Sequence, residues 1–553
     1  MSYLSKHGTR RVPQWLPLAG QVANSAGGHV WAVDVWTRLR RFLVLGSEGG
    51  SYYASEWALT RENAKAVEDA VREDGVRAVA EIVAVSREGR APKNDPALYA
   101  LALAAGVADD ETRKAALAAL PQVARTGTHL FQFAAFVDGF RGWGRSLRRA
   151  VARWYVDQPA EAVAYQAVKY RQRAGVSHRD LLRLSHPARR VGAGNPTVGV
   201  TDDHARLFEW IVRGGDTAGL PGIVEGFDRA QSATTATEAA ALIRAYRLPR
   251  EALQPDHLTS PEVWDALLDD MPMTALVRNL ATMTRVGVVT PGSDGTARAV
   301  AQLGNADRIR RARVHPIAVL AALRTYAAGH GARGRSTWAP VREVVDALDD
   351  AFYTSFGNVE PAGTRLLLAL DVSGSMAGGW VAGVPGLTPR EASAALALVM
   401  AATEEQYEIV GFFAGRGGYR KPGRQAWFGL TDGITPLAIS PRQRLDDAVK
   451  KVTKLNFGGT DTALPMLYAL AKEREVDTFV VYTDSETWAG DIHPTQALHD
   501  YRRASGIDAR LVVVGMVSNG FSIADPADPG MLDVVGFDTA TPQLISDFAR
   551  GAL

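Results

Sequence analysis

The sequence predicts two parts of different fold class, a long array of α-helical hairpins and, after it, one doubly wound α/β domain. From Thr60 onward, for about 300 residues, apolar residues recur at helical spacing in segments of about 10 to 16 residues, separated by short polar breaks. From Leu366 the pattern changes to short, continuous apolar runs, which are typical of strands buried in a parallel sheet. Stacked helical hairpins of this kind form an α-solenoid, which can curve and close into a ring.

Length and composition narrow the class of protein. A chain of 553 residues is too long for one core and predicts two to four domains. It has 46% hydrophobic and 22% charged residues, as ordinary soluble globular proteins do. The absence of cysteine excludes disulfides, cysteine-ligated zinc and thiol catalysis. The N-terminal segment lacks the apolar core of a signal peptide, and no apolar run is long enough to span a bilayer, so we expect a cytoplasmic protein with no membrane partner.

The chain before the first predicted helix has weak local patterns. Residues 1–35 are expected to be irregular, and the segment from Trp36 to Leu45 is predicted to form a strand. A glycine-rich stretch follows over residues 46–53. Because its spacing matches neither a P-loop nor a dinucleotide-binding fingerprint, we interpret it as a tight turn.

The helical segments have recognisable starts. Thr60 is expected to cap the first helix, which should end at Gly75, and Ser260 precedes Pro261 at the start of a later one. Further helices are predicted over residues 96–108, 110–124, 147–156, 160–169 and 203–212. The chain contains no exact internal repeat, so the array must be irregular.

The strand Leu366–Leu370 ends in a polar sequence that suits a metal ion. Asp371 follows it directly, and Ser373 and Ser375 come after, so that one carboxylate and two hydroxyls lie at the carboxyl end of a central strand. Open α/β sheets bind their ligands at this end. Oxygen ligands of low total charge suit a hard cation such as Mg²⁺ and leave it able to accept a further anion.

Two later stretches strengthen this prediction. A glycine-supported loop at residues 457–461 offers the Thr460 hydroxyl, and a second buried strand over residues 479–484 ends in Asp484. The alternative is that these strand-end carboxylates only cap helices. Together the three stretches resemble the metal-ion-dependent adhesion site of a von Willebrand factor A domain, over residues 361–553.

The resemblance implies a role for each of five residues toward one divalent cation, expected to be Mg²⁺. Ser373 and Ser375 would bind the ion directly, and Thr460 directly or through water. The two carboxylates would act mainly through water molecules and supporting hydrogen bonds. The predicted metal site therefore consists of Asp371, Ser373, Ser375, Thr460 and Asp484.

Basic residues are concentrated in one part of the helical array. Residues 121–190 contain thirteen Lys and Arg against four Asp and Glu, on a chain whose formal net charge is only +2. Solvated helix faces normally mix both signs of charge, so a one-sided excess indicates phosphate binding. The aromatic residues interleaved in this region are interpreted mainly as core.

Several motifs in residues 1–360 resemble the TROVE module. They are THLFQF from Thr128, WGRSLR from Trp143, KYRQRAGVSHRDLLRLSH from Lys169, RVHPIAVLAALRTYAAGHG from Arg313, and GSEGGSYY from Gly46. With the following A domain, nearly the whole chain is similar to the Ro ribonucleoprotein autoantigen family and its bacterial orthologues. The resemblance implies an α-helical HEAT-like repeat ring that is closed by the α/β doubly wound domain and is monomeric.

The same resemblance implies a function. Family members bind small non-coding Y RNAs on the outer surface of the ring and admit single-stranded 3′ ends of structured or misfolded RNAs into the central hole. Bacterial relatives are linked to RNA maturation and decay with 3′→5′ exoribonucleases, and to stress survival. We therefore expect these RNAs and nucleases as partners.

The family's Y RNA contacts transfer by position onto Lys169, Arg173 and His186. Neighbouring residues of suitable type are further candidates for phosphate or base contacts: Arg171, His178, Arg179 and Arg183. Because His186 precedes a proline, its alternative role is to end a helix.

No hydrolytic constellation is present in the sequence. It has no nucleophile elbow, no H-E-x-x-H motif and no Walker motif, and the predicted metal site lacks the clustered carboxylates of two-metal nucleases. The first hypothesis is a non-catalytic RNA-binding scaffold. Two alternatives stay open: a metal-dependent ribonuclease or phosphoesterase centred on Asp371, and an adhesion or chelatase-type protein whose A domain binds protein partners.

Overall fold

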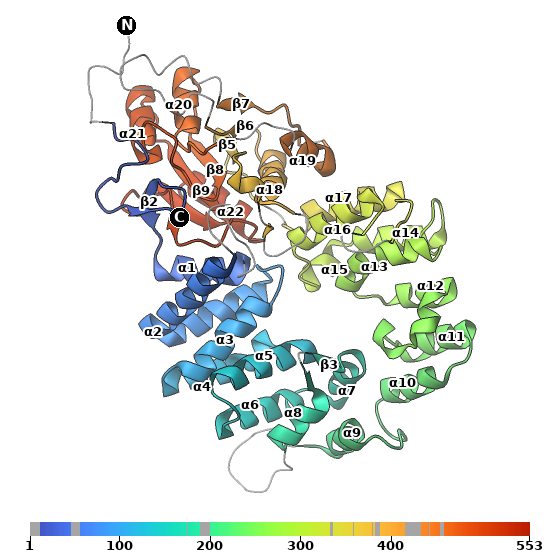
Figure 1. Ribbon diagram of the computed structural model, residues 1–553. Helices are drawn as coiled ribbons and strands as arrows, with labels where there is room; N and C mark the ends of the chain where they lie inside the picture. Colours follow the sequence, from blue (N-terminus) through green and yellow to red (C-terminus); the bar gives the residue numbers. More distant parts are fainter. Residues whose placement is uncertain are drawn as a thin grey trace.

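A computed structural model confirms the predicted fold class, a ring of helices joined to a doubly wound α/β domain (Figure 1). The structure describes residues 11–45, 56–173, 175–187, 200–331, 336–357, 359–378, 380–381, 387–414, 433–441, 443–453 and 458–552. Over these ranges, no helix is both long enough and apolar enough to cross a bilayer.

Seventeen helices build the ring in chain order, among the residues described. They are α1 (Val35–Leu45), α2 (Glu56–Glu88), α3 (Asp95–Val107), α4 (Asp110–Val123), α5 (Gly127–Phe140), α6 (Arg145–Val156), α7 (Ala160–Lys169), α8 (His178–Ser185), α9 (Asp202–Arg213), α10 (Gly222–Ser232), α11 (Ala236–Tyr246), α12 (Pro261–Asp269), α13 (Met273–Arg285), α14 (Asp294–Leu303), α15 (Ala306–Arg311), α16 (Pro316–Ala328) and α17 (Arg342–Thr354). Most predicted helices end within two residues of the observed bounds, because their caps and breaks are local signals.

Two predictions for the start of the ring are wrong. The segment Trp36–Leu45 forms the helix α1 and not a strand, with Trp36, Leu39 and Leu43 buried at helical spacing. The helix α2 begins at Glu56, before Thr60, and continues past Gly75 after a kink at Asp74, where φ is −155° and ψ is 95°. The predicted turn at residues 46–53 lies outside the described residues.

The α/β domain is built on a six-stranded sheet with the order β11-β9-β8-β5-β6-β7. Its strands are β5 (Leu366–Asp371), β6 (Tyr407–Phe412), β7 (Ile434–Pro436), β8 (Thr478–Thr483), β9 (Arg510–Gly515) and β11 (Met531–Val535); its helices are α18 (Pro389–Thr403), α19 (Leu445–Thr453), α20 (Leu464–Ala471), α21 (Pro494–Ser505) and α22 (Thr541–Ala549). All pairs are parallel except β6 with β7.

The central strand β5 is buried on both faces, as predicted. Alternate residues Leu366, Leu368 and Leu370 pack in one core with α18 and α22, whereas Leu367 and Ala369 pack in the opposite core with α20 and α21. Because both faces are covered by helices, the carboxyl ends of β5 and β8 form an edge at which a ligand can bind.

The N-terminal arm, residues 11–34, is not irregular. It contains β1 (Val22–Ala23) and β2 (His29–Ala32), which pair antiparallel with each other. The strand β2 also pairs with β10 (Phe521–Ser522) of the α/β domain. The arm therefore belongs to the surface of that domain, although the bounds 1–360 and 361–553 assign it to the helical part.

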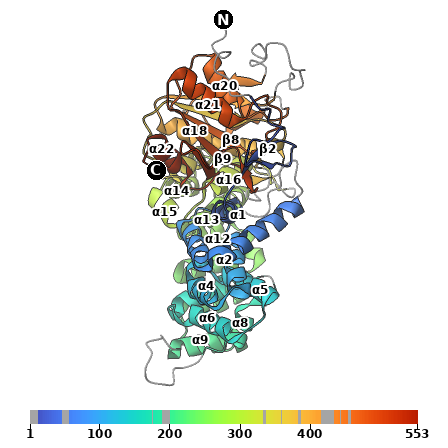
Figure 2. The ribbon, with the colours of Figure 1, turned by 90° about the vertical axis from the view of Figure 1, so that its left-hand side faces the viewer.

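The ring closes through the α/β domain, which contacts both ends of the helical array (Figures 1 and 2). At the seam, defined as Arg90, His315 and Asp538, three distant segments meet. Arg90 Nε donates to Asp538 Oδ2 at 2.5 Å, and the carbonyl of Arg90 lies 2.8 Å from Nε2 of His315. Asp538 is 1% exposed and His315 3% exposed, so the seam excludes water.

Candidate metal site and RNA-binding surface

The five predicted metal-site residues lie together at the carboxyl ends of β5 and β8, and all are buried. One carboxylate oxygen of Asp371 accepts the backbone N–H of Ser373 at 2.9 Å, and the other accepts the hydroxyl of Thr483 at 2.6 Å. The Ser373 and Ser375 hydroxyl oxygens are 3.0 Å apart. The sequence prediction therefore identified side chains that converge in space.

Polar atoms without partners indicate that this cluster suits a cation. Among the described residues, Thr460 Oγ1 and Asp484 Oδ2 are buried and have no hydrogen-bond partner. Such groups are costly unless something binds them. Burial, the nearby Asp371 carboxylate and Glu486 raise the pKa of Asp484 well above its ordinary value, and burial also raises the pKa of Asp371. A bound divalent cation would satisfy these oxygens and compensate the two carboxylates.

Sequence analysis did not identify Arg390, which supports the metal site from below. Arg390 lies on α18 and is 2% exposed; its Nη2 donates to the Ser373 carbonyl at 2.8 Å. The guanidinium thus fixes the loop that carries the two serines. The spacing of Arg390 from the motif offered no signal, because the contact depends on how α18 packs under β5.

The glycine-supported loop before α20 is confirmed at two positions. A Cβ at Gly458 would lie 2.7 Å from the Ala414 carbonyl oxygen, and one at Gly459 would lie 2.7 Å from the Trp488 ring. Both positions therefore need glycine for close packing. This packing brings Thr460 to the carboxyl end of the sheet, beside the loop that follows β8.

The predicted RNA-binding residues surround α8 and the short hairpin before it, β3 (Gln172–Arg173) and β4 (Val176–Ser177). Lys169 ends α7 and is half-buried. Its Nζ donates to the Tyr165 hydroxyl at 3.0 Å and lies over the rings of Tyr165 and Tyr170. Burial lowers the pKa of Lys169, but its hydrogen bond to Tyr165 and the nearby charges outweigh burial and raise it. The ammonium therefore stays charged at neutral pH.

Three of the candidate arginines have no acidic partner. Arg171, Arg179 and Arg183 are exposed, and none forms an ion pair with another described residue. The acidic neighbour Asp180 does not neutralise them, because it accepts hydrogen bonds from Ser177 in the capping box of α8. The result is a local positive surface on a nearly neutral protein.

Two further candidates are placed by the backbone. Arg173 lies in β3, where it pairs with Val176. His186 is exposed and ends α8 in a left-handed conformation with φ of 45°, and its N–H donates to the Leu182 carbonyl at 3.1 Å. Its side chain is nevertheless available on the same surface as Arg179 and Arg183.

His178 is the exception, because it lies in the core and not on the surface. It is 2% exposed, its Nδ1 is 2.8 Å from the Tyr155 hydroxyl, and its ring packs edge-on against Phe131. Burial lowers its pKa to about 4, so the ring is neutral at physiological pH. A direct contact between His178 and RNA is therefore excluded in this conformation, and His178 instead anchors the start of α8.

The comparisons with known proteins cover almost the whole chain. The TROVE domain model matches residues 22–208 and 249–325, and the model described as the Ro60 vWA domain matches residues 365–549. The RNA-binding protein RO60 of Deinococcus radiodurans is 46% identical over 96% of each chain. The chain belongs to the Ro60 family of RNA-binding proteins.

Further comparisons agree with this assignment. The RNA-binding protein RO60 of Caenorhabditis elegans is 34% identical and is matched over 98% of this chain and 92% of its own. The crystal structure of the Deinococcus radiodurans RO (RSR) protein superposes with a TM-score of 0.68 at 45% identity, and covers 94% of this chain and 100% of that one. RNA binding by this Ro60-family chain thus rests on relatives that match both of its parts.

The Ro60-family ring carries additional basic residues that sequence analysis counted but did not assign. They lie on α6, which packs against α8. Arg145, Arg148 and Arg149 are exposed and, like Arg179, form no ion pair with another described residue. Their one-sided charge in the sequence was the available signal. They extend the positive surface from α8 to α6.

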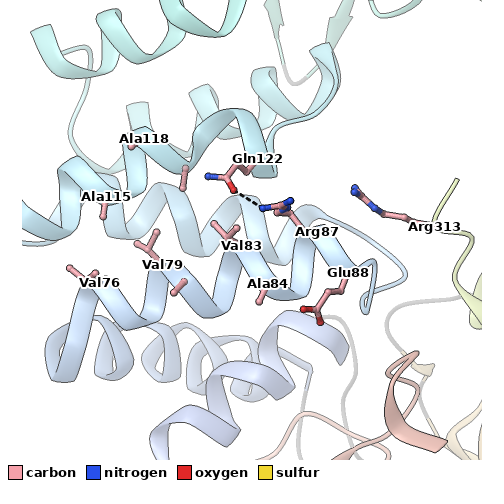
Figure 3. Close-up of a pocket in the computed structure, with 12 residues that line it drawn as sticks. Val76, Val79, Val83, Ala84, Arg87, Glu88, Ala115, Ala118, Gln122 and Arg313 are labelled. Carbon is pink, nitrogen blue, oxygen red and sulfur yellow. Dashed lines mark hydrogen bonds between the residues drawn. The ribbon is translucent and has the colours of Figure 1, made fainter. Parts of the chain in front are cut away.

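A groove of about 720 Å³ between α2 and α4 lies apart from both candidate sites (Figure 3). Valine and alanine side chains form its floor, and Arg87 and Arg313 lie at one end, where Arg87 donates to Gln122 at 3.3 Å. The groove shares no residue with the metal site or with the surface around α8. The two candidate sites of this Ro60-family protein are therefore a buried polar cluster and an exposed basic surface.

Proposed function

We propose that this Ro60-family protein binds small non-coding Y-type RNAs through the exposed basic residues around α8, on the outer surface of the ring. It takes single-stranded 3′ ends of structured or misfolded RNAs into the central hole. It works in the cytoplasm as a monomeric ring that holds RNA without cleaving it and presents ends to 3′→5′ exoribonucleases. RNA maturation, quality control, decay and survival of stress are the processes that such a scaffold would serve.

One observation supports this proposal above the others. Arg171, Arg179 and Arg183 are exposed and outside any ion pair with the described residues, whereas Arg244 and Arg298 elsewhere in the ring are paired with aspartates. Unpaired arginines grouped on and beside one helix are an electrostatic footprint for phosphates. The membership of the chain in an RNA-binding family makes RNA the ligand that this footprint fits.

Neutralising the three arginines should weaken RNA binding in a salt-dependent way. In the variant R171Q/R179Q/R183Q, each lost phosphate contact should lower the slope of log affinity against log salt by about 0.7 to 0.9. The measurement is a titration of a folded small RNA at several salt concentrations. The matched control is R213Q/R247Q/R310Q, which removes the same charge from exposed arginines that are ion-paired.

Two outcomes of this experiment would contradict the proposal. If both triple variants lose affinity equally, only net charge matters and the surface around α8 has no special role. If the folded RNA binds the first variant as tightly as wild type, the arginines are ordinary solvated residues. A second RNA with a single-stranded 3′ tail should keep its extra affinity in the variant, because the hole binds the tail through other residues.

The alternative of a metal-dependent nuclease centred on Asp371 has less support. Within the described residues, no group of three or more His, Asp or Glu side chains is arranged to hold a metal ion, whereas two-metal nucleases use clustered carboxylates. The RNA recovered from the titrations in Mg²⁺ should therefore keep intact ends. Cleavage that disappears in Asp371→Ala would favour the nuclease.

We also propose that the buried polar cluster holds one Mg²⁺ through Ser373, Ser375 and Thr460, with Asp371 and Asp484 supporting it through water. When bound, the ion would offer a coordination position to an oxygen ligand such as a partner's carboxylate. The residues fit this role because their hydroxyl and carboxylate oxygens converge and two of these oxygens have no partner among the described residues.

Asp484→Asn should make the protein insensitive to Mg²⁺ while stabilising the metal-free form. The substitution removes a buried carboxylate whose charged form is disfavoured by burial and by Asp371. Mg²⁺ in 100-fold excess over its dissociation constant should stabilise wild type by about 2.7 kcal/mol, and the variant by none of it. Calorimetric melting with and without Mg²⁺ measures both effects.

Asp477→Asn is the matched control for this substitution. Asp477 lies at the opposite end of β8 and is paired with Arg365, whose hydrogen bonds and charge lower the pKa of Asp477. This variant should be less stable than wild type but should respond to Mg²⁺ in full. An unchanged Mg²⁺ response in Asp484→Asn would contradict the assigned metal site.

A further inference from the structure

Arg41 is a buried cation that joins the first helix of the ring to the α/β domain. It lies on α1 and is 1% exposed. Its Nη2 forms two hydrogen bonds with the Asp533 carboxylate, at 2.7 and 2.8 Å, and its Nη1 donates to the carbonyls of Asn519 and Phe521, both at 2.9 Å. A buried guanidinium with this many fixed acceptors holds the two parts in one arrangement.

Asn519 continues this connection to the predicted metal site. Its Oδ1 accepts from Arg41 Nη1 at 2.7 Å, and its Nδ2 donates to the backbone carbonyl of Asp484 at 2.6 Å. Asn519 is 6% exposed, so water does not compete for either bond. The side chain of Asn519 thus bridges a helix of the ring and the loop that carries a metal-site carboxylate.

The N-terminal arm binds the same loop independently. Asn24 Nδ2 donates to the Thr487 carbonyl at 2.8 Å, and the Ala26 N–H donates to Glu486 at 3.0 Å. Gln14 reaches the other metal loop, where it donates to Asp461 at 2.8 Å. The residues that precede α2 therefore hold the two loops that bear Asp484 and Thr460.

We propose that Arg41 and Asn519 are positioning residues for the metal site and link its occupancy to the docking of α1 on the α/β domain. This inference rests on the proposed Mg²⁺ site. The connection Arg41–Asn519–Asp484 lets the docked helix hold the Asp484 loop in the arrangement that binds the ion. By thermodynamic linkage, a bound ion must favour the docked helix by the same factor.

The size of the effect follows from the role of outer residues at metal sites. Removing a group that fixes a metal ligand typically lowers metal affinity by about 10- to 100-fold. Asn519 acts through the backbone of Asp484, so about 10-fold is expected for Asn519→Ala. This variant leaves the Arg41–Asp533 pair intact and introduces no buried unpaired charge.

The test compares Mg²⁺ affinity and helix docking in the full chain. Titration calorimetry measures the dissociation constant for Mg²⁺, and amide hydrogen exchange over residues 35–45 with and without Mg²⁺ measures docking of α1. A second variant, R41Q/D533N, removes the other half of the connection without leaving a lone charge. Arg38→Gln is the matched control, because Arg38 lies on the same helix but pairs with Asp69 of α2.

In wild type and in Arg38→Gln, Mg²⁺ should bind normally and slow exchange in α1. In Asn519→Ala and in R41Q/D533N, Mg²⁺ should bind about 10-fold more weakly and exchange in α1 should no longer respond. Unchanged Mg²⁺ affinity in both test variants would overturn the inference, and so would exchange in wild-type α1 that ignores Mg²⁺. If wild type gives no binding heat with Mg²⁺, the proposed metal site itself fails and the linkage fails with it.

Discussion

Replacing Arg90 with alanine should open the ring seam and destabilise the protein by about 3 to 5 kcal/mol. The substitution leaves Asp538, which is 1% exposed, as a buried carboxylate without its cation. It also removes a side chain that joins the end of α2 to the loop before α22. Calorimetric melting measures the loss of stability, and small-angle X-ray scattering should show a larger radius of gyration if the ring opens.

Two further variants make this prediction specific. The pair R90Q/D538N removes both charges together and should be less destabilised than Arg90→Ala, because no lone charge stays buried. Arg247→Ala should change nothing measurable, since Arg247 and Asp270 form an exposed pair in the same ring. A melting curve of Arg90→Ala that matches wild type would show that the seam pair contributes no stability.

Acidification from pH 6.5 to pH 4 should weaken the same seam through His315, by up to about 3 kcal/mol. Nδ1 of His315 accepts the Ile317 N–H at 3.2 Å, so the ring proton lies on Nε2, which donates to the Arg90 carbonyl. Burial lowers the pKa of His315 to about 4 against opposing effects of Arg90 and Asp538. The folded state stays neutral down to this pH.

The sign follows from proton uptake. Between pH 6.5 and 4 the unfolded chain binds a proton at His315 that the folded chain does not bind, so stability falls as pH falls. Stability against pH should therefore have a smaller slope in His315→Gln than in wild type over this window. His330→Gln is the control, because His330 is exposed. Equal slopes in wild type and His315→Gln would contradict the assigned role.

The sequence predicted those parts of the fold that depend on local signals. Helix caps, breaks and the doubly buried strand β5 were found because each is written in neighbouring residues. The helix α1 was missed because Arg41 and Arg38 interrupt its apolar face, so the alternating residues suggested a strand. The buried position of Arg41 depends on Asp533, which lies 492 residues later in the chain.

The candidate sites show the same division. The metal-site residues converge as predicted because strand ends in a parallel sheet meet at one edge, whereas Arg390 reaches that edge only through the packing of α18. His178 has a residue type that suits RNA, but its place in the core is set by Tyr155 and Phe131. Residue type alone could not separate the buried histidine from the exposed arginines that flank it.

The pairing of the N-terminal arm with the α/β domain has a consequence for how the molecule is made. The strand β2 bonds to Ser522 and its neighbour, so the first strands to leave the ribosome wait for nearly the last ones. Contacts of such sequence separation form late and slowly. Until then the arm has an unpaired strand edge, which is prone to wrong association. Completion of the arm is therefore expected to be the last step of folding, after the helices have stacked in order of synthesis.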